Sequence, residues 1–252
     1  MIEVTELVKT YLPNNRALDG VSFKIEDGEV CGYLGANGAG KSTTIKILTG
    51  MLSADSGSVV VNGINVIQEP QKVKKIIGYV PESGALFQSL TPFDFLEFVC
   101  KMYSIDKNVY MRRIFEFMEM FDMKNEVRTP IASFSKGMSQ KVLIISSLIH
   151  NPDIIFWDEP LSGIDFKTTT LIINIVKDLS SHGKTFFYST HILDMMEKIC
   201  SKVIILNEGN VVHDEKMIAG SNRQSLEDVF RRYVDTGSSK EKASEIYKNM
   251  TN

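Results

Sequence analysis

The order of the predicted elements along the chain indicates an α/β fold into which an all-helical segment is inserted. Up to residue 85, short β-type runs alternate with turns, whereas from Thr91 to His150 the apolar residues recur at helical spacing. After His150 the β-type runs return, separated by two predicted helices at 165–181 and 191–200. A β-rich core that is interrupted by helices and then resumed is typical of an inserted subdomain.

Each predicted strand is a short run rich in β-branched, aromatic or aliphatic residues. In the first third these runs are IEVTELVK, VSFKIE, EVCGYLG, GSVVVNG and KIIGYV, and after the helical segment they are DIIFW, KTFFYS and KVIILN. Asp27-Gly28 and Asn62-Gly63 mark turns or hairpins between strands, since Gly accepts a positive φ. The helical segment contains FDFLEFVCKMY, VYMRRIFEFMEMF and a helix that starts after Phe134.

The bulk composition is that of an ordinary soluble globular protein. The 252 residues are 43% hydrophobic and 23% charged, and the net charge of −3 argues against non-specific binding of nucleic acid. Cys31, Cys100 and Cys200 fit no zinc spacing, and this odd, scattered set indicates a reducing cytosol. No apolar run approaches the ~18 residues of a membrane helix, and the N-terminus lacks the pattern of a signal peptide. We therefore expect any role at a membrane to depend on a partner protein.

A phosphate-binding loop follows the run EVCGYLG. The residues GANGAGKST fit the pattern G-x-x-x-x-G-K-[ST] and open the helix STTIKILTG, which is the context that this motif requires. Backbone N–H groups of such a loop surround the β-phosphate, the lysine reaches the β- and γ-phosphates, and the first hydroxyl ligates Mg²⁺. The predicted nucleotide-binding residues are Gly35, Ala36, Asn37, Gly38, Ala39, Gly40, Lys41, Ser42 and Thr43.

Two adjacent carboxylates, Asp158 and Glu159, end the buried run DIIFW. We expect Asp158 to hold Mg²⁺ and Glu159 to orient and deprotonate a water molecule. His191 follows the strand KTFFYS, where its ring would contact the γ-phosphate or hold Glu159 and the water in place. The predicted catalytic residues are therefore Glu159, His191 and Lys41.

A second helix start has the character of an anion site. In PIASFSKGMSQ, the residues Ser135, Lys136 and Gly137 precede the apolar run KVLIISSLIH. They present a hydroxyl, backbone N–H groups and the positive end of a helix dipole. Since the phosphate loop lies much earlier in the chain, the sequence raises the question of which phosphate this second helix start would bind.

These motifs together resemble the ATP-binding subunit of an ABC transporter. GANGAGKST, SFSKGMSQK, IIFWDEP, LSGID and STH occur in the family's order, and the resemblance extends from about residue 1 to about residue 235. It implies a phosphate-loop NTPase core, the ABC cassette, with an inserted all-helical subdomain and an antiparallel β subdomain, and with ATP and Mg²⁺ as ligands. The implied parts are 1–85 and 151–215 for the core with its β subdomain, 86–150 for the helical signature subdomain and 216–252 for a C-terminal helical tail.

The resemblance also answers the question of the second helix start. Two cassettes of this family stack head-to-tail, so Ser135, Lys136 and Gly137 would bind in trans the ATP that the other chain's phosphate loop holds. Lys136 stands where the family usually has Gly, so its cation either lies near the anion site or is an ordinary solvated lysine.

Three further positions match the family. Tyr11 corresponds to the aromatic residue that stacks on adenine, with an ordinary strand-end tyrosine as the alternative. Asp165 in LSGID corresponds to the loop at the dimer interface. Glu82 stands where most members have Gln, so a carboxylate would contact Mg²⁺ and water there.

The resemblance further implies a membrane partner, reached through the segment ALFQSLTPFDFLEFVCKMY. Leu86, Phe87 and Phe93 are expected to line an exposed groove, and Phe95, Leu96 and Phe98 are expected in the core. The ending SLEDVFRRY resembles the drug, peptide and sodium exporter branch. The chain is thus expected to be an ATPase at the cytoplasmic face of the membrane, peripheral through transmembrane permease subunits. It would form a homodimer, or a heterodimer with a second cassette, and bind no nucleic acid. A soluble ABC-type ATPase that remodels a macromolecular complex is the alternative.

Overall fold

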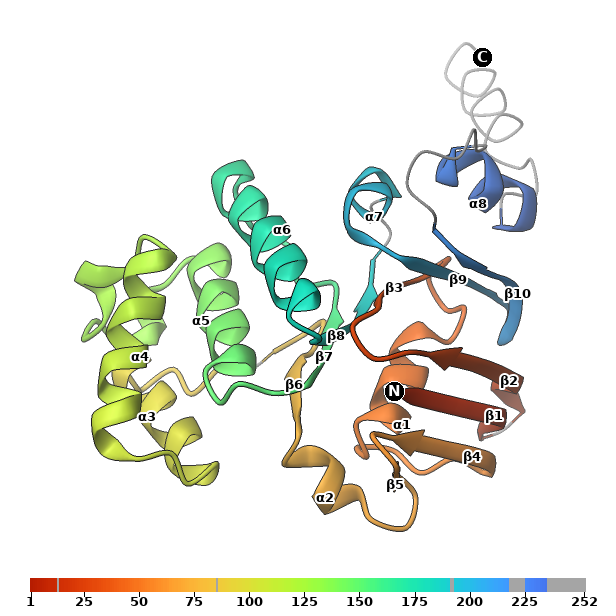
Figure 1. Cartoon of the computed structure of the whole chain (residues 1–252), viewed down its shortest axis with the longest axis horizontal. Helices are drawn as coiled ribbons and strands as arrows, with labels where there is room; N and C mark the ends of the chain where they lie inside the picture. Colours follow the sequence, from red (N-terminus) through yellow and green to blue (C-terminus); the bar gives the residue numbers. More distant parts are fainter. Residues whose placement is uncertain (13, 85, 191–192, 218–224, 235–252) are drawn as a thin grey trace, which may run out of the picture.

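The protein is built around two β-sheets (Figure 1). The computed structural model describes residues 1–12, 14–84, 86–190, 193–217 and 225–234. A four-stranded antiparallel sheet has the order β2-β1-β4-β5, and a six-stranded sheet has the order β10-β9-β3-β8-β7-β6. In the larger sheet, neighbouring strands from β9 to β6 are parallel, and β10 pairs antiparallel with β9 at the edge.

The strands of the smaller sheet are β1 (Ile2–Tyr11), β2 (Asn15–Ile25), β4 (Ser56–Val61) and β5 (Ile64–Asn65). Those of the larger sheet are β3 (Val30–Gly35), β6 (Ile77–Val80), β7 (Ile154–Asp158), β8 (Thr185–Ser189), β9 (Lys202–Asn207) and β10 (Asn210–Lys216). The turn Asn62-Gly63 joins β4 to β5 with positive φ at both residues, so the hairpin expected there is confirmed.

Alternate residues of the central strands enter two different hydrophobic cores. Trp157 and Phe186 pack in the core that includes the helical segment, whereas Phe156 and Phe187 pack in the core beneath the antiparallel sheet. Every residue of β3, β7 and β8 is buried. Parallel strands covered on both faces are continuously apolar for this reason, and DIIFW and TFFYS show that pattern.

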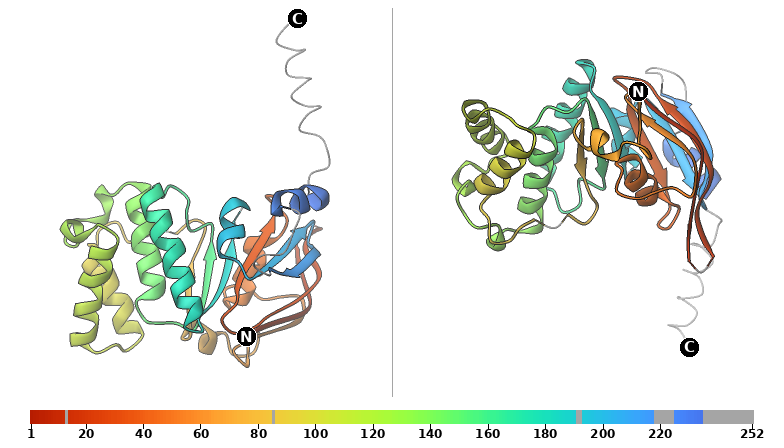
Figure 2. Two further views of the ribbon diagram at one scale, coloured as in Figure 1. Left: turned by 45° about the horizontal axis from the view of Figure 1, so that its top comes forward. Right: turned by 90° about the horizontal axis from the view of Figure 1, so that it is seen from below.

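Helices α3, α4 and α5 form one end of the molecule and the antiparallel sheet forms the other, as all three views show (Figures 1 and 2). Their bounds are α3 (Pro92–Met102), α4 (Lys107–Met120) and α5 (Lys136–Leu148), with 3₁₀ turns η1 (Lys124–Glu126) and η2 (Ile131–Ser133) between α4 and α5. Helix α3 begins in a capping box, because Thr91 accepts from the Asp94 N–H and the Asp94 carboxylate accepts from the Thr91 N–H.

The remaining helices are α1 (Lys41–Leu48), α2 (Pro70–Lys74), α6 (Phe166–Ser181), α7 (Leu193–Ile199) and α8 (Leu226–Val234). Helix α8 packs against α7 and β9, so the ending SLEDVFRRY joins the larger core. Three short or polar elements, α2, β5 and β10, were not expected from the sequence. The α/β fold class, with its helical insertion and antiparallel β part, is confirmed, and the exact domain boundaries stay predictions.

Three predicted exposures of aromatic and aliphatic residues are wrong. Phe93 and Leu86 are buried, whereas Phe98, expected in the core, is 48% exposed. Helical geometry explains the difference: positions 93, 96 and 100 share the inner face of α3, and Phe98 lies on the opposite side. Phe87 is 59% exposed, as expected, and its ring lies 6.5 Å from that of Phe98.

Candidate functional site

The phosphate loop connects the end of β3 to the start of α1 and depends on two close approaches of the backbone. A methyl group at Gly35 would lie 2.5 Å from the Leu206 carbonyl oxygen. At Gly40, the N-cap of α1, φ is +111° and a methyl group would lie 2.5 Å from the Ala17 carbonyl oxygen. Only glycine tolerates these contacts, and at Gly40 also the positive φ, so packing against β2 and β9 fixes the two glycine positions of the motif.

Lys41 is the first residue of α1, and its side chain bends back over the loop. Its Nζ donates hydrogen bonds to the Gly35 carbonyl oxygen at 2.8 Å and to the Ala36 carbonyl oxygen at 3.1 Å. Burial lowers the pKa of Lys41, and the nearby carboxylates of Glu159, Asp158 and Glu82 oppose that shift. A buried ammonium is thus held beside the backbone N–H groups that would surround a phosphate.

Asp158 ends β7 and is the most deeply buried carboxylate of the site, with 2% of its surface exposed. Burial raises its pKa, and among the described residues its Oδ1 accepts no hydrogen bond. A buried carboxylate oxygen without a donor fits a role as a cation ligand. Ser42 and Glu82 lie at the same cleft, where the Ser42 hydroxyl donates to Glu82 Oε2 at 3.4 Å.

These three oxygen-bearing residues suit Mg²⁺. No cluster of three or more His, Cys, Asp or Glu side chains able to hold a metal ion is found among the described residues. Mg²⁺ does not need one, because it usually retains water and is bound by one or two carboxylates together with substrate phosphates.

Glu159 adopts a left-handed backbone conformation, with φ of +49°. Its N–H donates to the Ser189 carbonyl oxygen at 3.0 Å, and the Thr190 hydroxyl donates to Glu159 Oε2 at 3.2 Å. A non-glycine residue in this conformation stores strain of about 1–3 kcal/mol, which is common at functional sites. Glu159 lines the nucleotide cleft. His191, the third predicted catalytic residue, lies outside the described residues.

One cleft of about 350 Å³ collects most of the predicted residues. It is lined by Tyr11, Asn15, Ala17, Asn37, Gly38, Gly40, Lys41, Ser42, Thr43, Glu82, Asp158 and Glu159. Gly35, Ala36 and Ala39 belong to the same loop but do not line the cleft. Asn15 and Ala17 were missed by the sequence analysis. They reach the site because Asn15 pairs with Tyr11 across the β1–β2 hairpin, which no local motif encodes.

Tyr11 lies at the rim of this cleft, at the end of β1. Its ring is 38% exposed, and its hydroxyl lies 3.4 Å from the Thr43 hydroxyl. A half-exposed aromatic face beside the phosphate loop is suited to stack on a base.

The second predicted anion site does not belong to this cleft: none of the described lining residues comes from α5. Ser135 is the N-cap of α5, and its hydroxyl accepts from the Met138 N–H at 3.2 Å. The Lys136 ammonium donates to the Ser162 hydroxyl at 2.7 Å. Gly137 approaches the backbone so closely that a methyl group there would lie 2.6 Å from the Gly163 carbonyl oxygen.

Asp165, the predicted interface residue, caps the N-terminus of α6. Its carboxylate accepts from the Thr168 N–H at 2.9 Å and from the Thr168 hydroxyl at 2.7 Å. These hydrogen bonds, chiefly the one from the backbone N–H, lower the pKa of Asp165 to about 2, with a smaller contribution from Lys141. The residue thus has a structural role within its own chain as well as any role across an interface.

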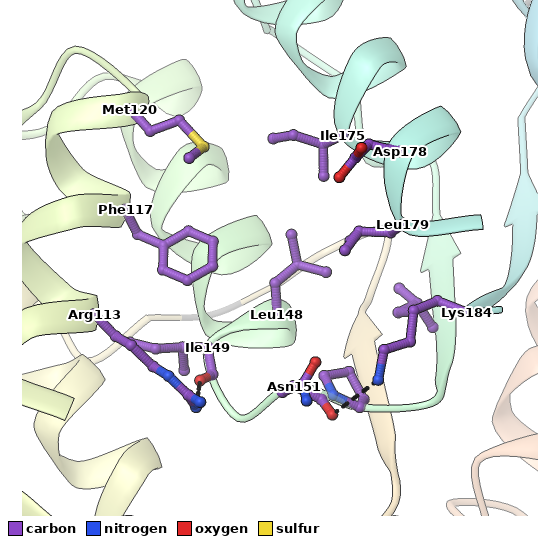
Figure 3. A pocket seen from close by; sticks show the side chains of 12 residues that line it. Arg113, Phe117, Met120, Leu148, Ile149, Asn151, Ile175, Asp178, Leu179 and Lys184 are labelled. Carbon is purple, nitrogen blue, oxygen red and sulfur yellow. Dashed lines mark hydrogen bonds between the residues drawn. The ribbon is translucent and has the colours of Figure 1, made fainter. Parts of the chain in front are cut away.

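A second cavity, of about 280 Å³, shares no residue with the nucleotide cleft (Figure 3). Phe117 and Met120 of α4 face Ile175 and Leu179 of α6 across it. Arg113 lies at its edge and donates to the Ile149 carbonyl oxygen at 2.9 Å, at the end of α5. The packing between the helical end of the molecule and α6 is therefore incomplete.

Within the part of the chain that the structure describes, none of the helices combines the length and the apolar character of a membrane span.

Comparisons with known proteins agree on one family. The ABC transporter family matches residues 18–162. An uncharacterised ABC transporter ATP-binding protein of Methanocaldococcus jannaschii, MJ1023, is 36% identical over 94% of this chain and 84% of the relative. The linearmycin resistance ATP-binding protein LnrL of Bacillus subtilis is 34% identical over 84% of this chain and 68% of the relative. A similar solved structure is the ATP-binding cassette MJ0796, a dimer in a post-hydrolysis state with bound ADP and Pi. It aligns with 87% of this chain and all of its own chain, with a TM-score of 0.81 and 26% sequence identity.

Proposed function

Because this chain belongs to the ABC transporter family and is one of its ATP-hydrolysing, ATP-binding subunits, we propose that it powers export through a membrane permease. Two cassettes would pair head-to-tail around ATP and separate after hydrolysis, which turns the loss of the γ-phosphate into motion of the permease. The observation that carries the ATP-hydrolysing part of this proposal is the meeting of Lys41, Ser42, Asp158 and Glu159 in one cleft.

In this proposal the cleft would supply most of the groups that phosphoryl transfer needs. Lys41 and the N–H groups of the loop would bind the β- and γ-phosphates, and Tyr11 would stack on the adenine. Ser42 and Asp158, with Glu82, would hold Mg²⁺, which when bound neutralises phosphate charge. Glu159, held by the Thr190 hydroxyl, would accept a proton from the attacking water.

The γ-phosphate would gain its remaining contacts from the opposite cassette. Ser135, Lys136 and Gly137 lie at the start of α5 and outside their own chain's cleft, so they are available to a nucleotide held by a second chain. A helix N-terminus with free N–H groups stabilises such an anion. The dimeric MJ0796 cassette supports pairing of this kind, and a second copy of this chain or a related cassette would serve.

Export is supported by the name of one relative, the linearmycin resistance ATP-binding protein LnrL. The chain would sit at the cytoplasmic face of the membrane, held there by the permease.

The surface for the permease is proposed to centre on the exposed ring of Phe87. Phe95 and Phe98 of α3 lie beside it, each with its ring centroid 6.5 Å from that of Phe87. Phe93 is excluded from this surface because it is buried against Phe115 and the Arg128 guanidinium.

The test of the ATP-driven dimer is the solution mass of the Glu159→Gln protein with and without ATP and Mg²⁺. The amide should keep nucleotide binding and slow hydrolysis, so the closed pair should accumulate and the mass should double with ATP only. A mass that stays that of one chain at saturating ATP would contradict self-pairing.

The test of the permease surface is copurification with the membrane subunit after Phe87→Asp and after Phe98→Asp. Both side chains are exposed, so the fold should survive while binding to the permease is lost. Met51→Asp, at an equally exposed apolar residue beyond α1, is the matched control. If both the Phe87→Asp and the Phe98→Asp protein still copurify with the membrane subunit, the permease binds another surface.

A further inference from the structure

The cavity between α4 and α6 has apolar walls. Phe117 and Met120 point into it from α4, and Figure 3 shows Ile175 and Leu179 of α6 on the opposite side. Its volume of about 280 Å³ lies near the lower end of the range of small-molecule sites, about 300–1,000 Å³, which are mostly apolar. A cavity of this size suits a small molecule, whereas a partner helix is too wide for it.

The walls of the cavity belong to packed elements. Ile149 at the end of α5 and Ile155 of β7 line it, and both are buried. Phe117, Ile175 and Leu179 pack against the same core. Because regular elements of the core bound it on several sides, the cavity keeps its shape without a ligand, and binding requires little reordering of the protein.

The cationic groups of the cavity lie along one edge. In the view of Figure 3, Arg113 and Lys184 extend to the lower edge beside Asn151, below Phe117 and Met120. The charge of Lys184 is compensated, because its Nζ lies 2.9 Å from Asp153 Oδ1.

Arg113 differs from Lys184 in this respect. Among the described residues, the Arg113 guanidinium has no carboxylate partner and donates one hydrogen bond, from Nη1 to the Ile149 carbonyl oxygen at 2.9 Å. A guanidinium carries several N–H donors in a planar fork that fits a carboxylate. Donors of Arg113 thus remain for an anion at the edge of the cavity.

Asp178 does not cancel this charge, although its carboxylate also lines the cavity. Its side chain is 73% exposed and lies in the upper part of the view, away from Arg113 (Figure 3). The carboxylate is therefore solvated, and the nearest cationic group that pairs with it is the ring of His182, whose Nδ1 lies 3.9 Å from Asp178 Oδ1. The cavity combines apolar walls with an unpaired cation at the opposite edge.

We propose that this cavity binds a small apolar carboxylate, whose carboxyl group pairs with Arg113 and whose apolar part lies between α4 and α6. Removal of apolar surface from water would drive binding, and the charge-assisted hydrogen bond would select a carboxylate over a neutral or cationic head group. The cavity shares no residue with the nucleotide cleft, so both ligands can be bound at once. A bound molecule would contact the helical end of the protein and α6 together.

The experiment is calorimetric titration of the full chain with decanoate, decanol and decylamine, each below the concentration at which it aggregates. These probes share one apolar chain and differ in the head group. Decanoate should bind about tenfold more tightly than decanol, the factor expected from one hydrogen bond between charged groups, and decylamine should bind more weakly than either. Decanoate should also raise the melting temperature, because it binds the folded chain.

Two variants test the two halves of the site. Arg113→Met should lower the affinity for decanoate to that for decanol and leave decanol binding unchanged, which also shows that the variant is folded. Met120→Trp, at a residue that is 49% exposed, should fill the cavity with an indole ring and weaken the binding of all three probes. Arg112→Met is the matched control, since Arg112 is the preceding residue of α4, pairs with Glu116 and does not line the cavity.

Several results would overturn the proposal. Absence of decanoate binding, equal affinities for the three probes, or a preference for decanoate that survives Arg113→Met would exclude a carboxylate site at Arg113. Unchanged decanoate binding by Met120→Trp would exclude the cavity as its location. A fluorescent ATP analogue should bind equally well with and without saturating decanoate, and its displacement would show that decanoate occupies the nucleotide cleft instead.

Discussion

The chain presents two helix starts that suit a phosphate, and they are built differently. Helix α1 begins at Gly40, which offers no side-chain cap, with a buried lysine and three carboxylates around it. Helix α5 begins at Ser135, whose hydroxyl caps its own helix, and the lysine that follows is exposed. The first helix start lines a cleft with other parts of its own chain, and the second does not.

This difference teaches that a helix N-terminus alone does not make a complete anion site. At α1 the strand β7, the hairpin β1–β2 and the loop at Glu82 bring carboxylates and an aromatic ring to the same cleft, where we propose that they bind Mg²⁺ and the base. At α5 the neighbouring turn supplies only a hydroxyl and carbonyl oxygens. In our proposal, the start of α5 binds phosphate only when a second chain supplies the nucleotide.

The largest expected difference between the two helix starts comes from replacing the lysine of each, Lys41 in α1 and Lys136 in α5, with methionine. Lys41→Met removes the cation that we propose binds the β- and γ-phosphates, so ATP hydrolysis should fall by about 10²–10³-fold, with ATP binding by the single chain weakened as well. Lys136→Met should leave ATP binding by the single chain unchanged. Equilibrium binding of a fluorescent ATP analogue measures both. Equal losses of binding in the two variants would abolish the distinction between the helix starts.

The two close-approach glycines provide the next comparison. Gly40→Ala meets both a positive φ and a contact of 2.5 Å, so it should lower the free energy of unfolding by about 2–4 kcal/mol and prevent ATP binding. Gly137→Ala meets only a contact of 2.6 Å with a turn that can shift, so it should keep the binding of ATP by its own chain and lower kcat. Gly63→Ala, at φ of +76° with no neighbour within 4 Å and outside the cleft, is the control for backbone strain alone. Thermal unfolding and ATP binding distinguish the three variants.

The sequence predicted the first site far better than the surroundings of the second. The loop from Gly35 to Thr43 is local, because a strand, a glycine-rich turn and a helix follow one another along the chain. Asp158 and Glu159 were predictable for the same reason: they end a continuously apolar strand. Contacts between distant segments were not predictable, and the hydrogen bond from Lys136 to Ser162 is one of them.

The aromatic residues of α3 show a second limit of the sequence. Composition marked the segment as unusually apolar, but the inner face of the helix depends on how α3 packs against α4 and α5. Phe93 and Phe98 were therefore assigned to the wrong faces. The capping box at Thr91, which would have fixed the first residue of the helix, was the available signal.

Asp158, in the cleft at the start of α1, and Asp165, the N-cap of α6, should affect stability with opposite dependence on pH. Burial raises the folded-state pKa of Asp158, so its ionised form destabilises the nucleotide-free protein, and this penalty lifts as pH falls through that raised pKa. Asp158→Asn should therefore stabilise the nucleotide-free protein at pH 7 while abolishing hydrolysis with Mg²⁺. Asp165 has a pKa lowered to about 2, so its contribution is present above pH 4 and is lost as pH falls toward 2.

Urea unfolding of Asp158→Asn and Asp165→Ala between pH 4 and pH 8 measures this contrast. The stabilisation from Asp158→Asn should shrink as pH falls, because a proton then neutralises the wild-type carboxyl. Asp165→Ala should lose stability across the whole interval, since the carboxylate cap of α6 is ionised throughout. A stabilisation by Asp158→Asn that is independent of pH would show that buried charge is not its cause.

The smallest expected effect is on the affinity for the adenine base, which we propose contacts only the cleft at α1. Tyr11→Ala should raise the dissociation constant of ATP about tenfold, since stacking on a base contributes about 1–3 kcal/mol. Tyr11→Phe should change it little, because the hydroxyl makes only a 3.4 Å contact with Thr43. In the Glu159→Gln background, saturating ATP should still double the mass of Tyr11→Ala, because the contacts of α5 are to phosphate and not to the base. Titration calorimetry with ATP and with inorganic triphosphate separates the two contributions: the triphosphate should bind Tyr11→Ala and the wild type alike, and a loss of triphosphate binding would mean that Tyr11 acts on the phosphate loop instead.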